Sequence, residues 1–303
     1  MKTLKLCLLS VALLLSSAPA FADLNVFACE PHWAALVKAI GGEHVHVTSA
    51  TGAYNDPHYI QARPSLIAKM RRADLLVCNG AQLEIGWLPV LLRQGDNERV
   101  QPGQPGNLDA SRYVRLRQIP TSVDRSLGDI HPDGNPHIQT SPRNIAALAP
   151  ELLKRMVALD PADAAYYQSH YQDFITRFDA AMAKWQQEAA PLKGMKIIVY
   201  HDGWVYMQHW LGLDVVGYLE PKPGIPPSPS HLAELLTQVK GGQVQGIIYT
   251  PYEDEQAPQW LSQRTGIPVA LIPDTVGADN DPDLFSFYDL MVSQLLKLHG
   301  EAK

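Results

Sequence analysis

Three histidines and one aspartate lie where loops or short apolar runs end, and their side chains suit metal binding. His58 and His137 each follow a proline, in Asn-Asp-Pro-His and Gly-Asn-Pro-His respectively. His201 comes directly after one apolar run, and Asp274 follows another. Three imidazoles and one carboxylate match the tetrahedral nitrogen and oxygen coordination that zinc prefers. The pattern therefore predicts a divalent metal site built from these four residues.

Each of the four residues also has an ordinary explanation. A lone loop histidine is more often a surface or capping residue than a ligand, and Asp274 could equally serve as a cap or turn residue before Gly277. The prolines that precede His58 and His137 fix one backbone dihedral and favour an extended predecessor, so each imidazole is presented from a stiff loop. A metal site is therefore expected only from the four residues taken together.

The sequence around these residues predicts alternating strands and helices, a pattern typical of a parallel sheet covered by helices. In open α/β sheets ligands bind beyond the carboxyl ends of strands, and the four residues follow predicted strands. The predicted strands are Leu24–Ala28, His44–Thr48, Leu75–Val77 and Val114–Leu116 in the first half, and Lys196–Tyr200, Val215–Tyr218, Gly246–Tyr249 and Val269–Ile272 in the second.

A long uninterrupted helix is predicted between the two halves. Residues 162–189 contain no glycine or proline, and their aromatic residues recur at helical spacing, as core packing requires. We therefore expect an α/β fold of two lobes, each a mostly parallel sheet flanked by helices, joined by one long rigid helix. The expected division is 1–22 as a signal peptide, 23–160 as the first lobe, 161–190 as the linking helix and 191–303 as the second lobe.

The composition excludes several classes of protein. Of the 303 residues, 46% are hydrophobic and 18% are charged, and 25 basic against 31 acidic residues give a net charge of −6. Intrinsic disorder is therefore excluded, and so is a nucleic-acid binder that works through bulk positive charge.

The first 22 residues have the features of an export signal. They combine two lysines, an apolar run too short to span a bilayer and an Ala-Phe-Ala cleavage site. Cys7 lies in the apolar run and not just after the cleavage site. We therefore expect a soluble periplasmic protein that is not lipid-anchored.

Two cysteines, Cys29 and Cys78, follow the first 22 residues, and each comes at the end of a predicted strand. An oxidising compartment favours a disulfide between them, whereas two separate buried thiols would behave as small apolar residues. Both interpretations remain open at this point.

Several short stretches, taken together, are similar to the ZnuA-like metal-binding subunits of bacterial ABC importers (the zinc/manganese cluster A-I family). They are Val37-Lys-Ala-Ile-Gly-Gly42, Asp56-Pro-His-Tyr59, Ala73-Asp-Leu-Leu-Val-Cys-Asn-Gly80, Asn135-Pro-His137, Tyr200-His201 and Ile272-Pro-Asp-Thr-Val-Gly277. The resemblance implies two α/β lobes on a rigid helix, with the metal held in the cleft between them. It also implies that His58, His137, His201 and Asp274 occupy the family's four ligand positions.

The resemblance further implies a binding protein that captures Zn²⁺ and delivers it to an ABC permease in the inner membrane. Such a protein is a monomer and not an enzyme, and a periplasmic zinc donor is a further partner that the resemblance allows. Manganese and iron relatives tend to carry glutamate at the position of His201, so a third imidazole favours zinc. A manganese- or iron-binding subunit of the same family is the alternative.

Two other classes of function fit the sequence less well. A zinc hydrolase would need an open metal position and a base such as Asp274, but the sequence contains no His-Glu-x-x-His helix, nucleophile elbow or phosphate-binding glycine loop. An exported adhesin is a role of some lipid-anchored relatives, and the position of Cys7 argues against it.

The sequence departs from the family pattern in the loop at 118–136. Zinc importers of this type often carry a long histidine-rich loop here, whereas this loop contains only His131. We expect His131 to be a solvated residue, with an accessory ligand as the alternative. Glu253-Asp-Glu255 is expected to be a solvated turn, and His32 has no partner that the sequence identifies.

Overall fold

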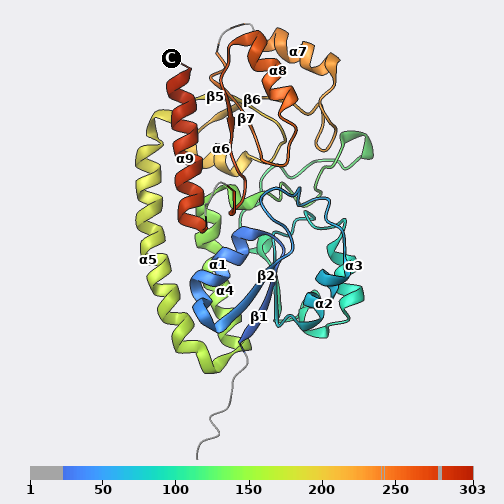
Figure 1. Ribbon diagram of the computed structural model, residues 1–303, viewed down its shortest axis with the longest axis vertical. Helices are drawn as coiled ribbons and strands as arrows, with labels where there is room; N and C mark the ends of the chain where they lie inside the picture. The colour runs from blue at the N-terminus through green and yellow to red at the C-terminus, as the bar shows by residue number, and fades with distance from the viewer. Residues whose placement is uncertain (1–22, 240, 242, 279–281, 303) are drawn as a thin grey trace, which may run out of the picture.

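The computed structural model describes residues 23–239, 241, 243–278 and 282–302, so the predicted signal peptide at 1–22 lies outside the described residues. Two parallel four-stranded sheets form two lobes along the long axis of the molecule (Figure 1). The predicted α/β fold is therefore confirmed, while the exact limits of the lobes stay predictions. Within the described ranges, no helix is long and apolar enough to cross a membrane.

The first lobe has the strand order β2-β1-β3-β4, with all strands parallel. Its strands are β1 (Leu24–Ala28), β2 (Val45–Ser49), β3 (Leu75–Cys78) and β4 (Asn107–Asp109), and its helices are α1 (Pro31–Gly41), α2 (Pro64–Arg72) and α3 (Leu88–Gly95). Each of these helices has a proline in its first turn, where the missing N–H has no intrahelical partner to lose. The central strand β3 is buried along its whole length, as expected for a sheet covered on both faces.

The fourth strand is not where the sequence predicted it. Val114–Leu116 is not a strand, and β4 lies earlier, at Asn107–Asp109. The Asp109 carboxylate accepts a hydrogen bond from the Ser111 N–H and caps a 3-10 helix over Ala110–Tyr113, which takes the chain away from the sheet. Val114 and Leu116 are apolar because they pack, partly buried, against the main hydrophobic core.

The second lobe repeats the first with the strand order β6-β5-β7-β8, again all parallel. Its strands are β5 (Lys196–Val199), β6 (Asp214–Tyr218), β7 (Gly246–Tyr249) and β8 (Val269–Leu271), and its helices are α6 (Val205–Leu211), α7 (Pro229–Val239), α8 (Gln256–Thr265) and α9 (Leu284–Glu301). Because the strands of each sheet are parallel, their carboxyl ends meet at one edge, where ligands of such sheets bind.

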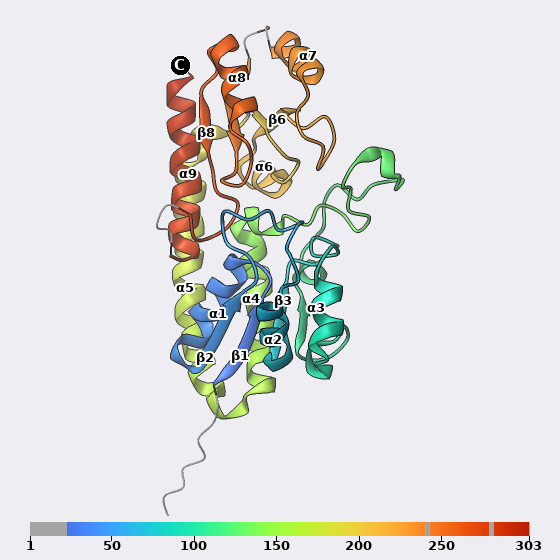
Figure 2. The same cartoon turned by 45° about the vertical axis from the view of Figure 1, so that its right-hand side comes forward.

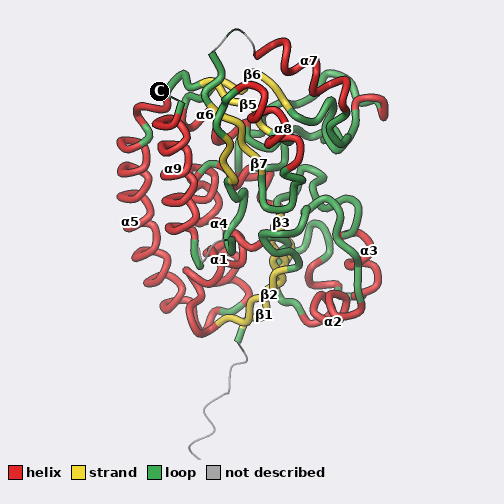
Figure 3. The backbone as a smooth tube through the Cα atoms, turned by 45° about the horizontal axis from the view of Figure 1, so that its top comes forward, coloured by secondary structure: helices red, strands yellow, loops and turns green. Residues whose placement is uncertain are grey.

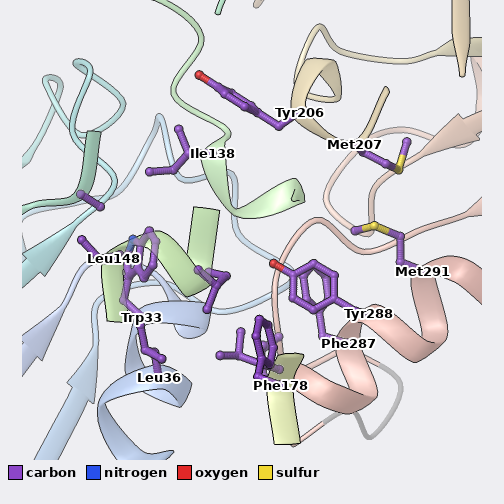
Figure 4. Close-up of a cluster of buried hydrophobic side chains, with 14 of the residues drawn as sticks. Trp33, Leu36, Ile138, Leu148, Phe178, Tyr206, Met207, Phe287, Tyr288 and Met291 are labelled. Atoms are coloured by element: carbon purple, nitrogen blue, oxygen red, sulfur yellow. The ribbon is translucent and has the colours of Figure 1, made fainter. Parts of the chain in front are cut away.

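The predicted long helix is confirmed as α5 (Ala164–Glu188), which runs alongside both lobes next to α4 (Pro142–Leu159) and α9 (Figures 1 and 3). Its 25 residues give a length of about 38 Å. Phe178 is fully buried on this helix, and its ring lies 6.0 Å from that of Tyr288 on α9 (Figure 4). The aromatic residues therefore bind the helix to the core, as the spacing predicted.

Cys29 and Cys78 form a disulfide, which is one of the two options that the sequence left open. Cys29 directly follows β1 and Cys78 ends β3, and these strands are neighbours with Ala28 opposite Val77. The bond therefore joins the two central strand ends of the first lobe.

The loop at 118–136, green in Figure 2, projects from the body of the molecule on the side away from α5.

Candidate metal centre

Three of the four predicted ligands come together between the lobes. His58 lies in the loop after β2, His137 ends the long connection after β4, and His201 follows β5 in the second lobe. One ligand atom from each imidazole lies within 4.8 Å of the corresponding atoms of the other two. The ring centroids are 5.2 Å apart for His58 and His137, and 5.2 Å apart for His137 and His201. Imidazole side chains from both lobes therefore lie close together at one place.

His137 is the most deeply buried of the three, with 2% of its surface exposed. Its Nε2 atom is buried without a hydrogen-bond partner. Its backbone N–H donates to Asn135 Oδ1 at 3.0 Å, which fixes the loop around Pro136. Burial, with the neighbouring histidines, lowers the pKa of His137 well below its usual value, so the ring is neutral. A neutral, unpartnered buried nitrogen costs about 1–3 kcal/mol unless something binds it.

His58 and His201 are each oriented by a carboxylate. Nδ1 of His58 lies 2.7 Å from Asp56 Oδ1, and Nδ1 of His201 lies 2.8 Å from Glu220 Oε2. Burial lowers the pKa of His201, but the hydrogen bond and charge of Glu220 outweigh it and raise that pKa to about 9. A carboxylate on one imidazole nitrogen leaves the other available and fixes its direction, as in many metal sites.

Asp274 stands apart from the three imidazoles. It follows β8 and is 5% exposed, but it is not in the group whose ligand atoms all lie within 4.8 Å of one another. The Tyr252 hydroxyl donates to its Oδ2 at 3.1 Å, while Oδ1 is buried without a partner. Burial raises the pKa of Asp274 to about 6.

The prediction that His131 is a solvated residue is wrong. Its Nε2 lies 3.3 Å from His58 Nε2, so it is a neighbour of the cluster and not a solvated loop residue. Burial lowers its pKa to about 4. The signal that could have found it is its position as the one histidine of the 118–136 loop, between two predicted ligands. His131 is not in the mutually close group that His58, His137 and His201 form.

The expectation of a solvated turn over Glu253-Asp-Glu255 is wrong for the half-buried Glu253 side chain, whereas Asp254 and Glu255 are exposed as expected. Its Oε2 accepts a hydrogen bond from the Thr250 N–H at 2.6 Å, and Oε1 is buried without a partner. Burial raises the pKa of Glu253 to about 8. A cavity of about 70 Å³ next to His58 and His201 is lined by four carboxyl groups, those of Asp56, Asp129, Glu220 and Glu253.

The chemistry of this centre suits a divalent cation. Imidazole nitrogens supply the donors, and the carboxylates that orient His58 and His201 supply negative charge, which offsets the charge of the ion. Unpartnered atoms on His137, Asp274 and Glu253 all lie in this region. Buried polar atoms without a partner are rare in proteins, and three around one cluster indicate a missing binding partner.

A family model described as "ZnuA: Zinc-uptake complex component A periplasmic" matches residues 26–300. Among similar proteins, SloC of Streptococcus mutans, a metal ABC transporter substrate-binding lipoprotein, is 22% identical over 274 residues, which cover 88% of this chain and 86% of SloC. PsaA of Streptococcus anginosus, a manganese ABC transporter substrate-binding lipoprotein, is 22% identical over 98% of this chain and 96% of PsaA. The zinc-binding lipoprotein AdcA of Streptococcus pneumoniae is 22% identical over 77% of this chain and 46% of AdcA.

Solved structures share the fold. The crystal structure of ZnuA superposes with a TM-score of 0.72 at 20% identity, over 93% of this chain and 100% of that one. A manganese-bound periplasmic metal binding protein from Candidatus Liberibacter asiaticus has a TM-score of 0.72 at 18% identity, with the same coverage. At these identities the likeness establishes the two-lobed architecture alone.

The relatives also correct one expectation from the sequence. SloC, PsaA and AdcA are all named lipoproteins, and a lipoprotein is anchored at a membrane through its lipid. The expectation of a soluble periplasmic protein that is not lipid-anchored, which rested on the position of Cys7, is therefore wrong.

The match over residues 26–300, the two-lobed fold and the named relatives agree with the resemblance seen in the sequence. The relatives are named for zinc and for manganese, and the family's members serve ABC transporters of metals. The chain belongs to the ZnuA family of metal-transport substrate-binding proteins.

Proposed function

We propose that this protein captures one Zn²⁺ ion between its lobes and delivers it to an ABC permease. The observation that carries the proposal is the convergence of His58, His137 and His201, whose ligand atoms lie within 4.8 Å of one another. Two of these residues belong to the first lobe and one to the second, so a bound ion would hold the lobes together. Asp274, with its unpartnered Oδ1, is the proposed fourth ligand.

The donor set supports zinc over manganese. Manganese prefers oxygen-rich coordination, whereas three imidazoles favour zinc among available ions. Each of His58 and His201 has a carboxylate on Nδ1, which strengthens the other nitrogen as a donor. The alternative within the family is a manganese- or iron-binding subunit, and the chemistry at His201 is the argument against it.

Binding without catalysis is the simpler role for this centre. A catalytic zinc keeps one coordination position open for water, whereas a closed site uses four protein ligands. Here Asp274, which lies outside the close group of histidines, has a buried Oδ1 without a partner, and its Oδ2 accepts a hydrogen bond from the Tyr252 hydroxyl. The unpartnered Oδ1 atom makes Asp274 available as the fourth ligand of a closed site, which argues against a zinc hydrolase.

The 118–136 loop is the proposed moving part during delivery. Asp129 accepts a hydrogen bond from the Tyr59 hydroxyl in the first lobe, and its own N–H donates to the Pro223 carbonyl in the second at 2.8 Å. The loop therefore touches both lobes next to the cluster. Further hydrogen bonds join the loop to Lys222 and Asp202 in the second lobe, so we expect His131 to leave His58 only when these contacts break together.

The test is a competition titration of Zn²⁺ and Mn²⁺ against a chelator, with metal analysis of the loaded protein. We expect one tight equivalent of zinc, a loss of affinity greater than about 100-fold for His58→Ala, and a shift toward manganese for His201→Glu. His231→Ala is the control, because that ring bonds the Tyr218 carbonyl at 2.9 Å within the second lobe. Absence of tight zinc, or binding indifferent to both substitutions, would contradict the proposal.

A further inference from the structure

One further histidine, which is not among the proposed ligands, lies fully buried between the lobes. His32 on α1 has no exposed surface, and both of its ring nitrogens are used. Nε2 lies 2.8 Å from Asn79 Oδ1 in the first lobe, and Nδ1 lies 2.8 Å from the Thr275 hydroxyl in the second. Thr275 is the neighbour in sequence of Asp274. His32 therefore connects the first lobe to the residue beside a proposed ligand.

Asn79 is the centre of this network, and its side-chain orientation is forced by its partners. Trp33 Nε1, which can only donate, lies 2.5 Å from Asn79 Oδ1. The Pro136 carbonyl, which can only accept, lies 2.9 Å from Asn79 Nδ2. Oδ1 must therefore face Trp33 and His32, and Nδ2 must face Pro136 and the Oε1 atom of Gln139 at 2.9 Å.

This orientation fixes the proton on His32. Because Asn79 Oδ1 accepts, Nε2 of His32 must carry the hydrogen that it donates. Burial lowers the pKa of His32 to about 3, so the ring is neutral and Nδ1 is an acceptor. The Thr275 hydroxyl must therefore donate to Nδ1. Only one arrangement of protons satisfies the whole chain of contacts.

A second branch reaches Asp274 itself. Gln139 accepts from Asn79 through Oε1, so its Nε2 is the donor to the Asp274 carbonyl at 3.2 Å. The Gln139 carbonyl in turn accepts from the Tyr288 hydroxyl on α9 at 2.7 Å. The loop after β8 is thus held at two adjacent residues, through the backbone of Asp274 and the side chain of Thr275.

We propose that His32 and Thr275 are positioning residues that set how closely the Asp274 carboxylate approaches the three imidazoles, and thereby set metal affinity and preference. The inference rests on the proposed function, because it takes Asp274 and His137 as ligands. Asn79 also bonds the carbonyl of Pro136, next to His137, so one side chain fixes the spacing of ligands from both lobes. The imidazoles supply the nitrogen donors, and the position of the carboxylate decides how much oxygen coordination the ion receives.

The experiment compares Thr275→Val, which keeps the shape but removes the donor, with Thr275→Ser, which keeps the donor. We expect Thr275→Val to weaken Zn²⁺ binding by about 10- to 100-fold and Thr275→Ser to remain close to wild type. The visible spectrum of bound Co²⁺ should change for Thr275→Val and not for Thr275→Ser, an effect that lost stability alone would not produce. His32→Ala combined with Thr275→Val should be no worse than either single variant.

The same titration includes His58→Ala to separate the two proposals. Weak zinc binding by the wild type, or no effect of His58→Ala, overturns the proposed function. If His58→Ala abolishes binding while Thr275→Val and Thr275→Ser bind zinc equally and give the same Co²⁺ spectrum, the positioning role alone is wrong. Should Thr275→Val fail to fold, His32→Gln takes its place, with unchanged affinity and spectrum as the contradicting result.

Discussion

The two lobes have the same strand order, yet they place their metal-binding residues in different ways. In the second lobe, His201 follows the end of β5 at Val199 almost directly, and Asp274 follows the end of β8 at Leu271. In the first lobe, His58 and His137 lie far along loops after β2 and β4. A ligand beside a strand end inherits the rigidity of the sheet, whereas a ligand on a loop needs local support.

That support is visible throughout the first lobe. Proline precedes both loop histidines, Asp56 bonds the ring and the backbone N–H of His58, and Asn79 holds the carbonyl before His137. A disulfide joins the central strand ends of the first lobe, while residues 191–303 contain no cysteine. The first lobe therefore uses cross-links to keep its loop ligands in place, whereas in the second lobe His201 lies directly beyond a strand end.

Removal of the disulfide is expected to have the largest effect, because it takes away a covalent cross-link that the second lobe lacks. Cys29→Ser with Cys78→Ser opens a link across 49 residues, for which loop-closure entropy predicts a loss of about 4 kcal/mol in unfolding free energy. Denaturant unfolding of the metal-free protein would measure it, with the reduced wild type as the control that should match the variant. A loss below about 1 kcal/mol would mean that the first lobe does not need this cross-link.

A smaller and more local comparison uses the two carboxylates that orient histidines. Asp56→Asn and Glu220→Gln each remove one charge and keep the shape of the side chain. We expect Asp56→Asn to weaken zinc binding by about 100-fold, because it releases a loop ligand, and Glu220→Gln by about tenfold, because His201 keeps its strand end. Zinc competition titrations of the two variants at one pH would measure the ratio. Equal losses, or a greater loss for Glu220→Gln, would contradict the comparison.

The sequence predicted the fold because it depends on local patterns, whereas the three converging histidines were singled out by their residue types together with the resemblance to the ZnuA-like family. Alternating apolar runs give the parallel sheets, and residues after strand ends meet at one edge. The strand expected at Val114–Leu116 was wrong because apolar residues that pack against a core resemble a strand in a single sequence. Local pattern cannot distinguish the two.

The parts of the site that the sequence missed depend on contacts between residues distant in the chain. His131 reaches His58 because its loop lies across both lobes, and Glu253 lines the same cavity as His58 and His201, which come from other parts of the chain. The partner of His32, Thr275, is separated from it by 243 positions. Contacts between residues that are distant in the chain leave no pattern in the neighbouring sequence. The residues around His131 and Glu253 alone therefore predict solvated side chains.

The central claim is that imidazoles from both lobes bind one zinc ion. X-ray absorption spectroscopy of the zinc-loaded full chain tests it most directly, because it counts imidazole ligands and measures their distances. We predict three imidazole nitrogens at about 2.0–2.1 Å and one carboxylate oxygen at about 2.0–2.2 Å, with one imidazole lost in His201→Ala. Two or fewer imidazoles in the wild type, or a spectrum unchanged by His201→Ala, would contradict the account.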